Sequence, residues 1–314
     1  MRYLVMLLAA VLLQACAAPV FAPPADRGIP IAFMGDTPYS AGEAAQLDQL
    51  IDDLNRQDLA FIVHVGDITA GRGPCSDEWF QARLAQFSRL RHPFILIPGD
   101  NDWTDCHRSG MDPLERLARF REIFEPGERS LGQASMPLER QSSEPRFAEY
   151  REHMRWTAGR VLFITLNVQG SNNNFGRTER MNEEYRKRMR AVFAWMDGAE
   201  ARVKRDNLAG LCILVQADPD FELAWKTSQS RDTDGFADFR DALRRISLSL
   251  GKPVLFVHGD THTFRLDRPL DASPGQPLAN FIRLEVPGSP WVQWVRATLH
   301  PDAAMPFYVE PGPR

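Results

Sequence analysis

The sequence lacks the short motifs of several common enzyme classes. It contains no Gly-x-Ser-x-Gly elbow, no Gly-x-x-x-x-Gly-Lys phosphate-binding loop and no His-Glu-x-x-His helix motif. An excess of basic charge is also missing, because 37 Lys and Arg residues stand against 41 Asp and Glu residues, for a formal net charge of -4. Without the basic field that nucleic-acid backbones select, we expect no nucleic-acid partner, and nothing indicates a protein partner.

The chain opens with an apolar segment that is short. Residues 1–18 have Arg2 followed by an apolar run over residues 3–13, too short for a spanning helix and typical of a secretory signal peptide. Residues 13–16, Leu-Gln-Ala-Cys, also resemble the lipobox of bacterial lipoproteins, so lipidation of Cys16 and ordinary cleavage stand as alternatives. We expect an exported protein, periplasmic or lipid-anchored to the bacterial envelope, with a Pro/Ala-rich linker over residues 19–28 and one domain over residues 29–314.

Four apolar stretches of strand length each end in Gly-Asp. They cover residues 31–36, 61–67, 94–100 and 254–260 and end in Asp36, Asp67, Asp100 and Asp260. If the strands lie side by side in a parallel sheet, their carboxyl ends open into one crevice, where α/β folds bind ligands. Carboxylates packed that closely raise one another's pKa unless cations neutralise them. A single Gly-Asp is typical of a turn or helix cap, but four, with Asn101 and His262 beside two of them, favour a metal site.

Apolar residues at helical spacing lie between the strands. We predict helices over residues 40–57, from Ser76 as N-cap, from Asp112 with Pro113 in the first turn, and over residues 179–207 and 234–250. We also predict a surface loop over residues 127–145, a hairpin over residues 147–168 and an Asn-rich loop over residues 170–176. The alternation of strands and helices predicts an α/β fold.

Cysteine is scarce: apart from Cys16, the chain has only Cys75, Cys106 and Cys212. Cys75 and Cys106 follow the strands that end at residues 67 and 100, so both lie on loops leaving the same edge of the crevice. Because export permits oxidation, we predict a disulfide between them. Cys212 lies in the apolar stretch 211–215 and is predicted to be a buried thiol.

The residues at the four strand ends resemble, in their order and spacing, the sequence motifs of the calcineurin-like metallophosphoesterase superfamily, which includes the purple acid phosphatases. The matching residues are Asp36, Gly66-Asp67, Gly99-Asp100-Asn101-Asp102 and Gly259-Asp260-Thr-His262. The resemblance covers nearly the whole mature chain and implies a sandwich of two mixed β-sheets flanked by helices, with a two-metal centre at the sheet edge. It also implies hydrolysis of a small phosphoester substrate by a metal-activated water, without a covalent enzyme intermediate.

The resemblance also assigns metal ligands position by position. It implies ligation by Asp36, Asp67, Asp100, Gln216, Asp260 and His262. Several positions depart from the family's motifs. Pro38 replaces a His and leaves Tyr39 as the nearest substitute. Gln216 takes the place of a lone His, with Asp218 as the alternative, and Asp260 replaces the first His of Gly-His-x-His.

The Gly-Asp-Asn-Asp segment can be aligned with the family motif in two ways. An ungapped match makes Asp100 the ligand and puts Asn101 where the family has its catalytic His, whereas a one-residue shift makes Asn101 the ligand and puts Asp102 in the His place. We favour the ungapped match. His107 could supply the missing imidazole as a proton donor, and Arg108 could bind a phosphate oxygen. The catalytic candidates are therefore His107, Asn101 and Asp102.

The resulting ligand set is poor in histidine. Asp67 matches the carboxylate that bridges two ions, and oxygen-rich sites suit hard ions, so we expect two divalent metal ions, with Mn²⁺ or Mg²⁺ favoured at least as much as Zn²⁺ or Fe. His64 and His258, each in an apolar strand, are predicted to support ligands and not to bind metal. The altered motifs leave a second hypothesis, a catalytically degenerate binding or scaffold protein on the same fold.

Overall fold

The computed structural model describes residues 28–222 and 231–310, and two large β-sheets run through them. The first sheet has the strand order β14-β13-β1-β2-β3. Its strands are β1 (Ile29–Met34), β2 (Ile62–His64), β3 (Phe94–Leu96), β13 (Val295–Leu299) and β14 (Phe307–Val309). β1, β2 and β3 are parallel, whereas β13 runs antiparallel to β1. The Gly-Asp pairs that follow β1, β2 and β3 therefore meet at one edge of the sheet.

The second sheet has the strand order β4-β5-β6-β7-β8-β12-β9. Its strands are β4 (Glu139–Arg140), β5 (Met154–Ala158), β6 (Val161–Thr165), β7 (Gly210–Leu214), β8 (Val254–His258), β9 (Arg265–Asp267) and β12 (Phe281–Glu285). β6, β7, β8 and β12 are parallel, and β5 and β9 run antiparallel to their neighbours. A separate small hairpin joins β10 (Asp271–Ser273) and β11 (Gln276–Pro277).

Side chains alternate between the two faces of each sheet and so build three apolar layers. Between the sheets, Phe33 and Val63 of the first sheet share one buried cluster with Phe163 and Leu255 of the second. The opposite face of each sheet packs against helices in its own cluster. The molecule is thus layered as helices, sheet, sheet and helices.

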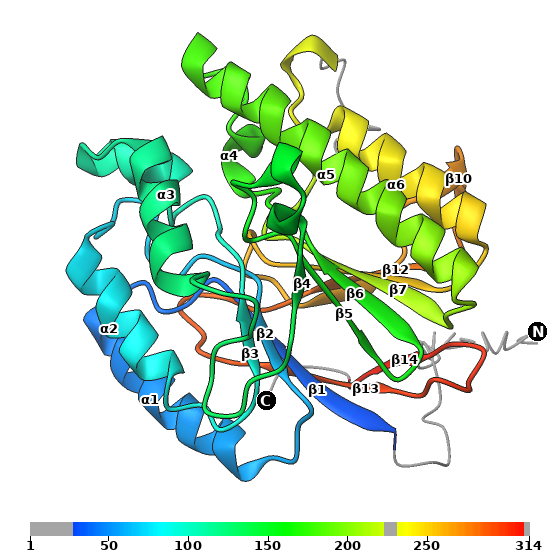
Figure 1. Cartoon of the computed structure of the whole chain (residues 1–314), viewed down its shortest axis with the longest axis horizontal. Helices are drawn as coiled ribbons and strands as arrows, with labels where there is room; N and C mark the ends of the chain where they lie inside the picture. The colour runs from blue at the N-terminus through cyan, green and yellow to red at the C-terminus, as the bar shows by residue number, and fades with distance from the viewer. Residues whose placement is uncertain (1–27, 223–230, 311–314) are drawn as a thin grey trace, which may run out of the picture.

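Helices cover both outer faces (Figure 1). α1 (Ala41–Arg56), α2 (Asp77–Phe87) and α3 (Pro113–Phe124) lie outside the first sheet, and α5 (Glu179–Arg205) and α6 (Ala237–Leu250) lie outside the second. Ser76 and Asp112 accept hydrogen bonds from first-turn amides, so the two predicted helix starts are confirmed. The predicted sandwich of two mixed sheets flanked by helices is confirmed as well.

Three segments differ from the sequence prediction. The hairpin begins only at Met154, because residues 147–153 follow a short helical turn, η3 (Pro145–Phe147), and carry no strand. The segment predicted as a loop over residues 127–145 contains β4 and the turn η2 (Gln141–Ser143). The Asn-rich segment contains α4 (Gly170–Asn173), a tight turn in left-handed conformation that asparagine tolerates better than most residues.

Other predictions fall on residues that the structure leaves undescribed. The expected leader over residues 1–18, with Cys16, and all but the last residue of the expected linker lie outside the described ranges. Within residues 28–222 and 231–310, no helix has both the length and the apolar character needed to span a membrane.

Candidate metal centre

The loops after β1, β2, β3 and β8 bring four aspartates together. Three of the four, Asp36, Asp67 and Asp260, have left-handed backbone conformations, with φ of 51°, 59° and 78°. His262 shares this conformation, with φ of 62°. A left-handed conformation costs an L-residue about 1–2 kcal/mol and persists only where the surroundings enforce it. Such strain at four neighbouring positions marks this edge of the sheets as a functional site.

Glycines make room for these carboxylates. A Cβ on Gly99 would lie 2.0 Å from Asp67 Oδ1, and a Cβ on Gly259 would lie 1.8 Å from Asp36 Oδ2. In each case the glycine of one Gly-Asp pair accommodates the aspartate of another. The Gly-Asp pairs are therefore more than local turns, because they allow carboxylates from different strands to converge.

A third glycine marks a space between two carboxylates. A Cβ on Gly170 would lie 2.6 Å from Asp260 Oδ1 and 2.8 Å from Asp100 Oδ2. Only a residue without a side chain leaves that space open.

The buried carboxylates of the cluster repel one another, and bound cations would neutralise them. Burial, reinforced by the neighbouring carboxylates, raises the pKa of Asp36, Asp67 and Asp260 well above the usual range of aspartate. Asp36 Oδ2 is buried and has no hydrogen-bond partner. Buried polar atoms are almost always paired, so an unpaired carboxylate oxygen in this position fits a metal ligand.

Asp67 lies at the middle of the cluster. Its Oδ1 accepts a hydrogen bond from the Asn101 backbone amide at 2.9 Å. Its Oδ2 accepts from the Tyr39 hydroxyl at 3.0 Å and from Gln216 Nε2 at 3.2 Å. Contacts from three separate loops suit the bridging position that the sequence predicted for Asp67.

His262 is oriented as a metal ligand would be. Its Nδ1–H donates to the Ser289 carbonyl at 2.7 Å, which leaves the lone pair on Nε2. Nε2 lies 3.1 Å from the Tyr39 hydroxyl and 3.8 Å from Asp36 Oδ1. The predicted ligand His262 therefore faces the carboxylates through its unprotonated nitrogen.

Tyr39 was named from the sequence only as a substitute for the missing histidine. Its hydroxyl contacts Asp67, His262 and, at 3.0 Å, the Asn101 amide nitrogen. Burial and the nearby carboxylates raise its pKa well above the usual range of tyrosine. Pro38 in the histidine position was the signal that pointed to Tyr39, and its hydroxyl lies among the predicted ligands Asp67 and His262.

Asp100 and Asn101 face different parts of the cluster. Asp100 Oδ2 accepts a hydrogen bond from Ser171 Oγ at 2.9 Å and lies on the Asp260 side of the centre. Asn101 turns its amide towards Tyr39. These positions are compatible with the ungapped match, in which Asp100 is the predicted ligand.

The structure gives Asp102 a role that differs from the predicted catalytic one. Its Oδ2 accepts from the backbone amides of Asp67 and Gly99 at 2.9 and 2.8 Å, and its Oδ1 accepts from the amide of Ile68 at 2.9 Å. The side chain is fully buried, and burial raises its pKa to about 7. Asp102 therefore joins the loops after β2 and β3, because both its oxygens are occupied by main-chain donors.

The orientation of the Gln216 side chain also differs from the predicted one, in which its oxygen binds metal. Its Oε1 accepts from the Gly170 backbone amide at 2.7 Å. An N–H group can donate only to the oxygen of the amide, so this contact fixes the side-chain orientation. The Gln216 amino group consequently points at Asp67 Oδ2 and Asp260 Oδ1, at 3.2 and 3.4 Å.

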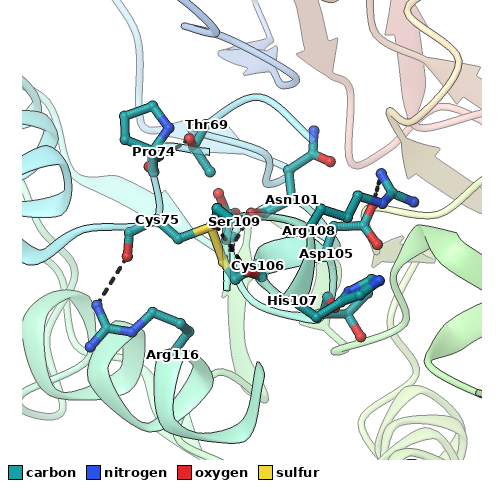
Figure 2. The surroundings of a disulfide bond; sticks show 12 residues. Thr69, Pro74, Cys75, Asn101, Asp105, Cys106, His107, Arg108, Ser109 and Arg116 are labelled. Atoms are coloured by element: carbon teal, nitrogen blue, oxygen red, sulfur yellow. Dashed lines mark hydrogen bonds and ion pairs between the residues drawn. A yellow bond between two sulfur atoms is a disulfide. The ribbon is translucent and has the colours of Figure 1, made fainter. Parts of the chain in front are cut away.

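The predicted disulfide is present beside Asn101 (Figure 2). Cys75 and Cys106 are bonded, and each Sγ lies 3.5 Å from the Asn101 carbonyl oxygen. The bond joins the loop after Asp67 to the turn after Asp100 and so confirms the prediction. Cys212 is a free, buried cysteine, also as predicted.

The turn that carries Cys106 also presents charged groups near the centre (Figure 2). This turn is η1 (Thr104–Ser109), and within it Asp105 is buried and forms an ion pair with Arg108. Arg108 NH1 and Asn101 Oδ1 lie 3.1 and 2.9 Å from the point where a Cβ on Gly71 would sit, so both groups border the same space. Arg108 therefore stands at the rim of the centre.

His107 lies farther out on the same turn. It is exposed, and its Nδ1 lies 2.9 Å from the Thr104 carbonyl oxygen and 3.0 Å from Arg177 NH1. Within the described ranges, no hydrogen bond or ion pair joins His107 to the aspartates of the cluster. Any contact of His107 with the reaction must therefore come through a bound substrate.

The two strand histidines are buried and neutral. His64 Nε2–H donates to the Thr37 carbonyl at 2.8 Å, and burial lowers its pKa to about 4. His64 thus supports the backbone beside Asp36. Burial lowers the pKa of His258 to about 3, and its Nδ1–H donates to the Gly259 carbonyl at 2.8 Å.

A second group of possible ligand atoms lies behind Asp260. Atoms of Asp218, His258 and Glu285 lie within 4.8 Å of one another. Arg265 reaches both carboxylates, with Nε 2.6 Å from Glu285 Oε2 and NH2 3.4 Å from Asp218 Oδ2. Because arginine already supplies the positive charge here, this group is better described as an ion-pair network under the centre.

The fold places a cluster of carboxylates at the common edge of a two-sheet sandwich, an arrangement that suits a metal-dependent hydrolase. Residues 29–264 match the model of the calcineurin-like phosphoesterase family, and the chain belongs to that family. It is accordingly a hydrolase of phosphoric ester bonds, and membership implies divalent metal ions.

Solved structures that resemble this chain include two phosphatases. A dimetal phosphatase from Danio rerio is 13% identical, with a TM-score of 0.58 over 90% of this chain and 99% of that chain. A purple acid phosphatase from yellow lupin (Lupinus luteus) seeds is 14% identical, with a TM-score of 0.45 over 90% of this chain and 50% of that chain. No curated protein matches the sequence.

Proposed function

We propose that this chain is an exported phosphoester hydrolase whose carboxylate centre works with two divalent metal ions. The observation that carries the proposal is the buried, unpartnered Asp36 Oδ2 among carboxylates whose pKa values are raised by burial and mutual repulsion. Bound ions would neutralise these charges and activate a water for attack on phosphorus. The protein's own task is to hold the ligands and to bind, orient and protonate the substrate.

Two sets of residues would hold the ions. One set comprises Asp36, His262 and the Tyr39 hydroxyl, and the other comprises Asp100 and Asp260. Asp67 contacts Tyr39 of the first set and Gln216, whose amino group also reaches Asp260 of the second set, so Asp67 would be shared between them. Because oxygen atoms dominate, Mn²⁺ and Mg²⁺ suit the centre at least as well as Zn²⁺ or Fe.

The rim of the centre supplies groups for a phosphoester. Arg108 and Asn101 border the same space beside Gly71, and the buried carboxylate of Asp105 holds the Arg108 guanidinium. A guanidinium so placed would bind non-bridging phosphoryl oxygens. His107, on the same turn, would donate a proton to the leaving oxygen once the substrate extends outwards from the centre.

Export is supported by the sequence of residues 1–18 and by the disulfide, which is typical of oxidising compartments. Cell fractionation of the full chain and of a Cys16→Ser variant tests the anchor. A lipidated protein should move from the membrane fraction to the soluble periplasmic fraction in the variant. Unchanged soluble localisation would favour ordinary cleavage, and a cytoplasmic, uncleaved protein would contradict export.

The activity test uses the chelator-treated mature protein and a panel of phosphomonoesters, phosphodiesters and nucleotides. We expect no turnover without metal, turnover after addition of Mn²⁺ or Mg²⁺, and a rise in melting temperature with the same ions. Metal binding without turnover of any substrate would favour the alternative of a binding or scaffold protein. If the melting temperature did not change on addition of Mn²⁺, Mg²⁺ or Zn²⁺, the proposal of a metal centre would be contradicted.

A further inference from the structure

The two sets of predicted ligands differ in how many of their oxygen atoms already accept hydrogen bonds from the protein. In the set around Asp36, the Oδ2 atom has no partner, and His262 turns an unprotonated nitrogen inwards. Asp36 Oδ1 accepts from the Asp260 backbone amide at 2.9 Å, so Oδ2 is the oxygen of Asp36 that has no donor. In the set around Asp260, donors reach both oxygens of Asp260 and Oδ2 of Asp100. Asp100 Oδ2 accepts from Ser171 Oγ at 2.9 Å, and Asp260 Oδ2 accepts from the Asp218 backbone amide at 3.0 Å.

Gln216 adds a second donor to this set. Its amino group approaches both Asp67 Oδ2 and Asp260 Oδ1. An amide nitrogen carries no available lone pair, so in this orientation Gln216 offers positive partial charge where a ligand would offer electrons. A cation that binds between Asp67 and Asp260 must displace these hydrogen bonds.

The orientation of Gln216 is held by a rigid segment. Its oxygen accepts from Gly170, which begins a turn of four left-handed residues, Ser171–Asn174, with φ between 50° and 63°. Arg188 of α5 holds the turn by donating to Asn173 Oδ1 at 2.7 Å and to the Asn173 carbonyl at 2.9 Å. Rotating the Gln216 amide would leave the buried Gly170 N–H facing an amino group, which makes the observed orientation the stable one.

We propose that the two metal positions are unequal. The position formed by Asp36, Asp67 and His262 fills at low free metal, whereas the position between Asp67 and Asp260 fills only at higher free metal, because the ion must displace the Gln216 amino group. This inference rests on the proposed function. It makes Gln216 a positioning residue that sets the metal concentration at which the centre is complete.

Calorimetric titration of the metal-depleted protein with Mn²⁺ tests the proposal. We expect two binding events whose Kd values differ by about tenfold or more, the second of which must overcome the Gln216 hydrogen bonds. Electron paramagnetic resonance should show an isolated Mn²⁺ spectrum after the first event and a spin-coupled pair after the second. Two events of equal affinity, or a coupled pair from the first addition, would overturn the proposal.

Variants assign the two events to positions. Asp36→Asn should remove or weaken the tight event, and Asp260→Asn should weaken only the second. Gln216→His replaces the donor with an imidazole lone pair and should bring the two Kd values together, whereas Gln276→His on the exposed β11 hairpin controls for an added surface histidine. The assignment would be contradicted if Asp260→Asn lost the tighter Mn²⁺-binding event. It would also be contradicted if the two Kd values stayed as far apart in folded Gln216→His as in the wild type.

The failure of this inference can be distinguished from failure of the proposed function. A wild-type protein that binds no Mn²⁺ in any event would refute the metal centre altogether. A wild-type protein that binds two ions equally and hydrolyses phosphoesters would keep the proposed function and refute only the inequality. If Gln216→His does not fold, the wild-type titration and the two Asn variants still decide between these outcomes.

Discussion

The two sides of the metal centre are held in different ways. On the side of β1, β2 and β3, main-chain amides fix the carboxylates: Asp67 accepts from the Asn101 amide, and Asp102 accepts from three amides. On the side of β7 and β8, the side chain of Gln216 and the ion-pair network of Asp218, Glu285 and Arg265 support the site. The first side is held mainly by main-chain amides, with the Tyr39 and Ser171 hydroxyls in addition. The second side is held mainly by side chains, with the Asp218 amide in addition.

This difference separates what fixes the centre from what tunes it. Backbone donors follow from the course of the chain, so a substitution cannot remove them without moving a loop. Side-chain donors such as the Gln216 amide are changed by one substitution that leaves the fold alone. We therefore expect the first side to control whether metal binds at all and the second side to control how tightly the last ion binds.

The largest effect should come from Asp67, which contacts both sides. Asp67→Asn removes the charge at the shared position, and two cations would then repel across a weaker bridge. Turnover should fall by more than about a hundredfold, and metal content should fall with it. Asp58→Asn, at an exposed position just after α1, is the matched control. A folded Asp67→Asn protein with normal metal content and rate would remove Asp67 from the centre.

The disulfide should stabilise the first side by joining its two outer loops. Replacing both Cys75 and Cys106 with serine opens a connection between residues 31 apart in sequence. The loss should reduce the free energy of unfolding by about 3–4 kcal/mol and weaken the tight metal event, since both sulfurs contact the Asn101 carbonyl. Denaturant unfolding and the Mn²⁺ titration measure the two effects. Mass spectrometry of the non-reduced wild type must show the bond, and two free thiols would contradict it.

Gly99 is one of the glycines that make room for the carboxylates, and replacing it should reduce stability nearly as much as loss of the disulfide. Gly99→Ala would place a Cβ 2.0 Å from Asp67 Oδ1 and 2.6 Å from the Asp67 backbone nitrogen. The forced displacement should cost about 1–3 kcal/mol of stability and reduce metal affinity. Gly127→Ala, whose added Cβ meets no atom within 4 Å, is the control. Equal stability and metal affinity in the two variants would show that Asp67 can shift without consequence.

The sequence revealed the first side of the centre better than the second. Apolar runs that end in Gly-Asp are local patterns, and they located all four aspartates. The role of Asp102 was hidden, because it depends on amides from two loops that meet only in the fold. The orientation of Gln216 was hidden for the same reason, since the Gly170 amide that fixes it comes from a loop of unusual left-handed turns.

The smallest expected effect lies away from the centre, on the side of the second sheet, and is independent of metal. His153 is buried, its Nδ1–H donates to Gln141 Oε1 at 2.6 Å, and burial lowers its pKa to about 4 from an ordinary value of 6.5. Between pH 6.5 and pH 4 the unfolded chain therefore binds a proton that the folded chain does not. This histidine's contribution should lower the free energy of unfolding as the pH falls through that window, by at most about 1.4 kcal/mol per pH unit, and should level off below pH 4.

His153→Asn keeps an N–H donor for Gln141 but cannot titrate. Other groups shape the pH dependence of both proteins equally, so the difference between the two unfolding free energies isolates His153. Relative to its value at pH 7.5, that difference should move in favour of the variant as the pH falls from 6.5 to 4, in urea titrations with chelator present. Parallel curves for the two proteins across this window would show that His153 takes up its proton equally well in the folded state, which its burial against Gln141 argues against.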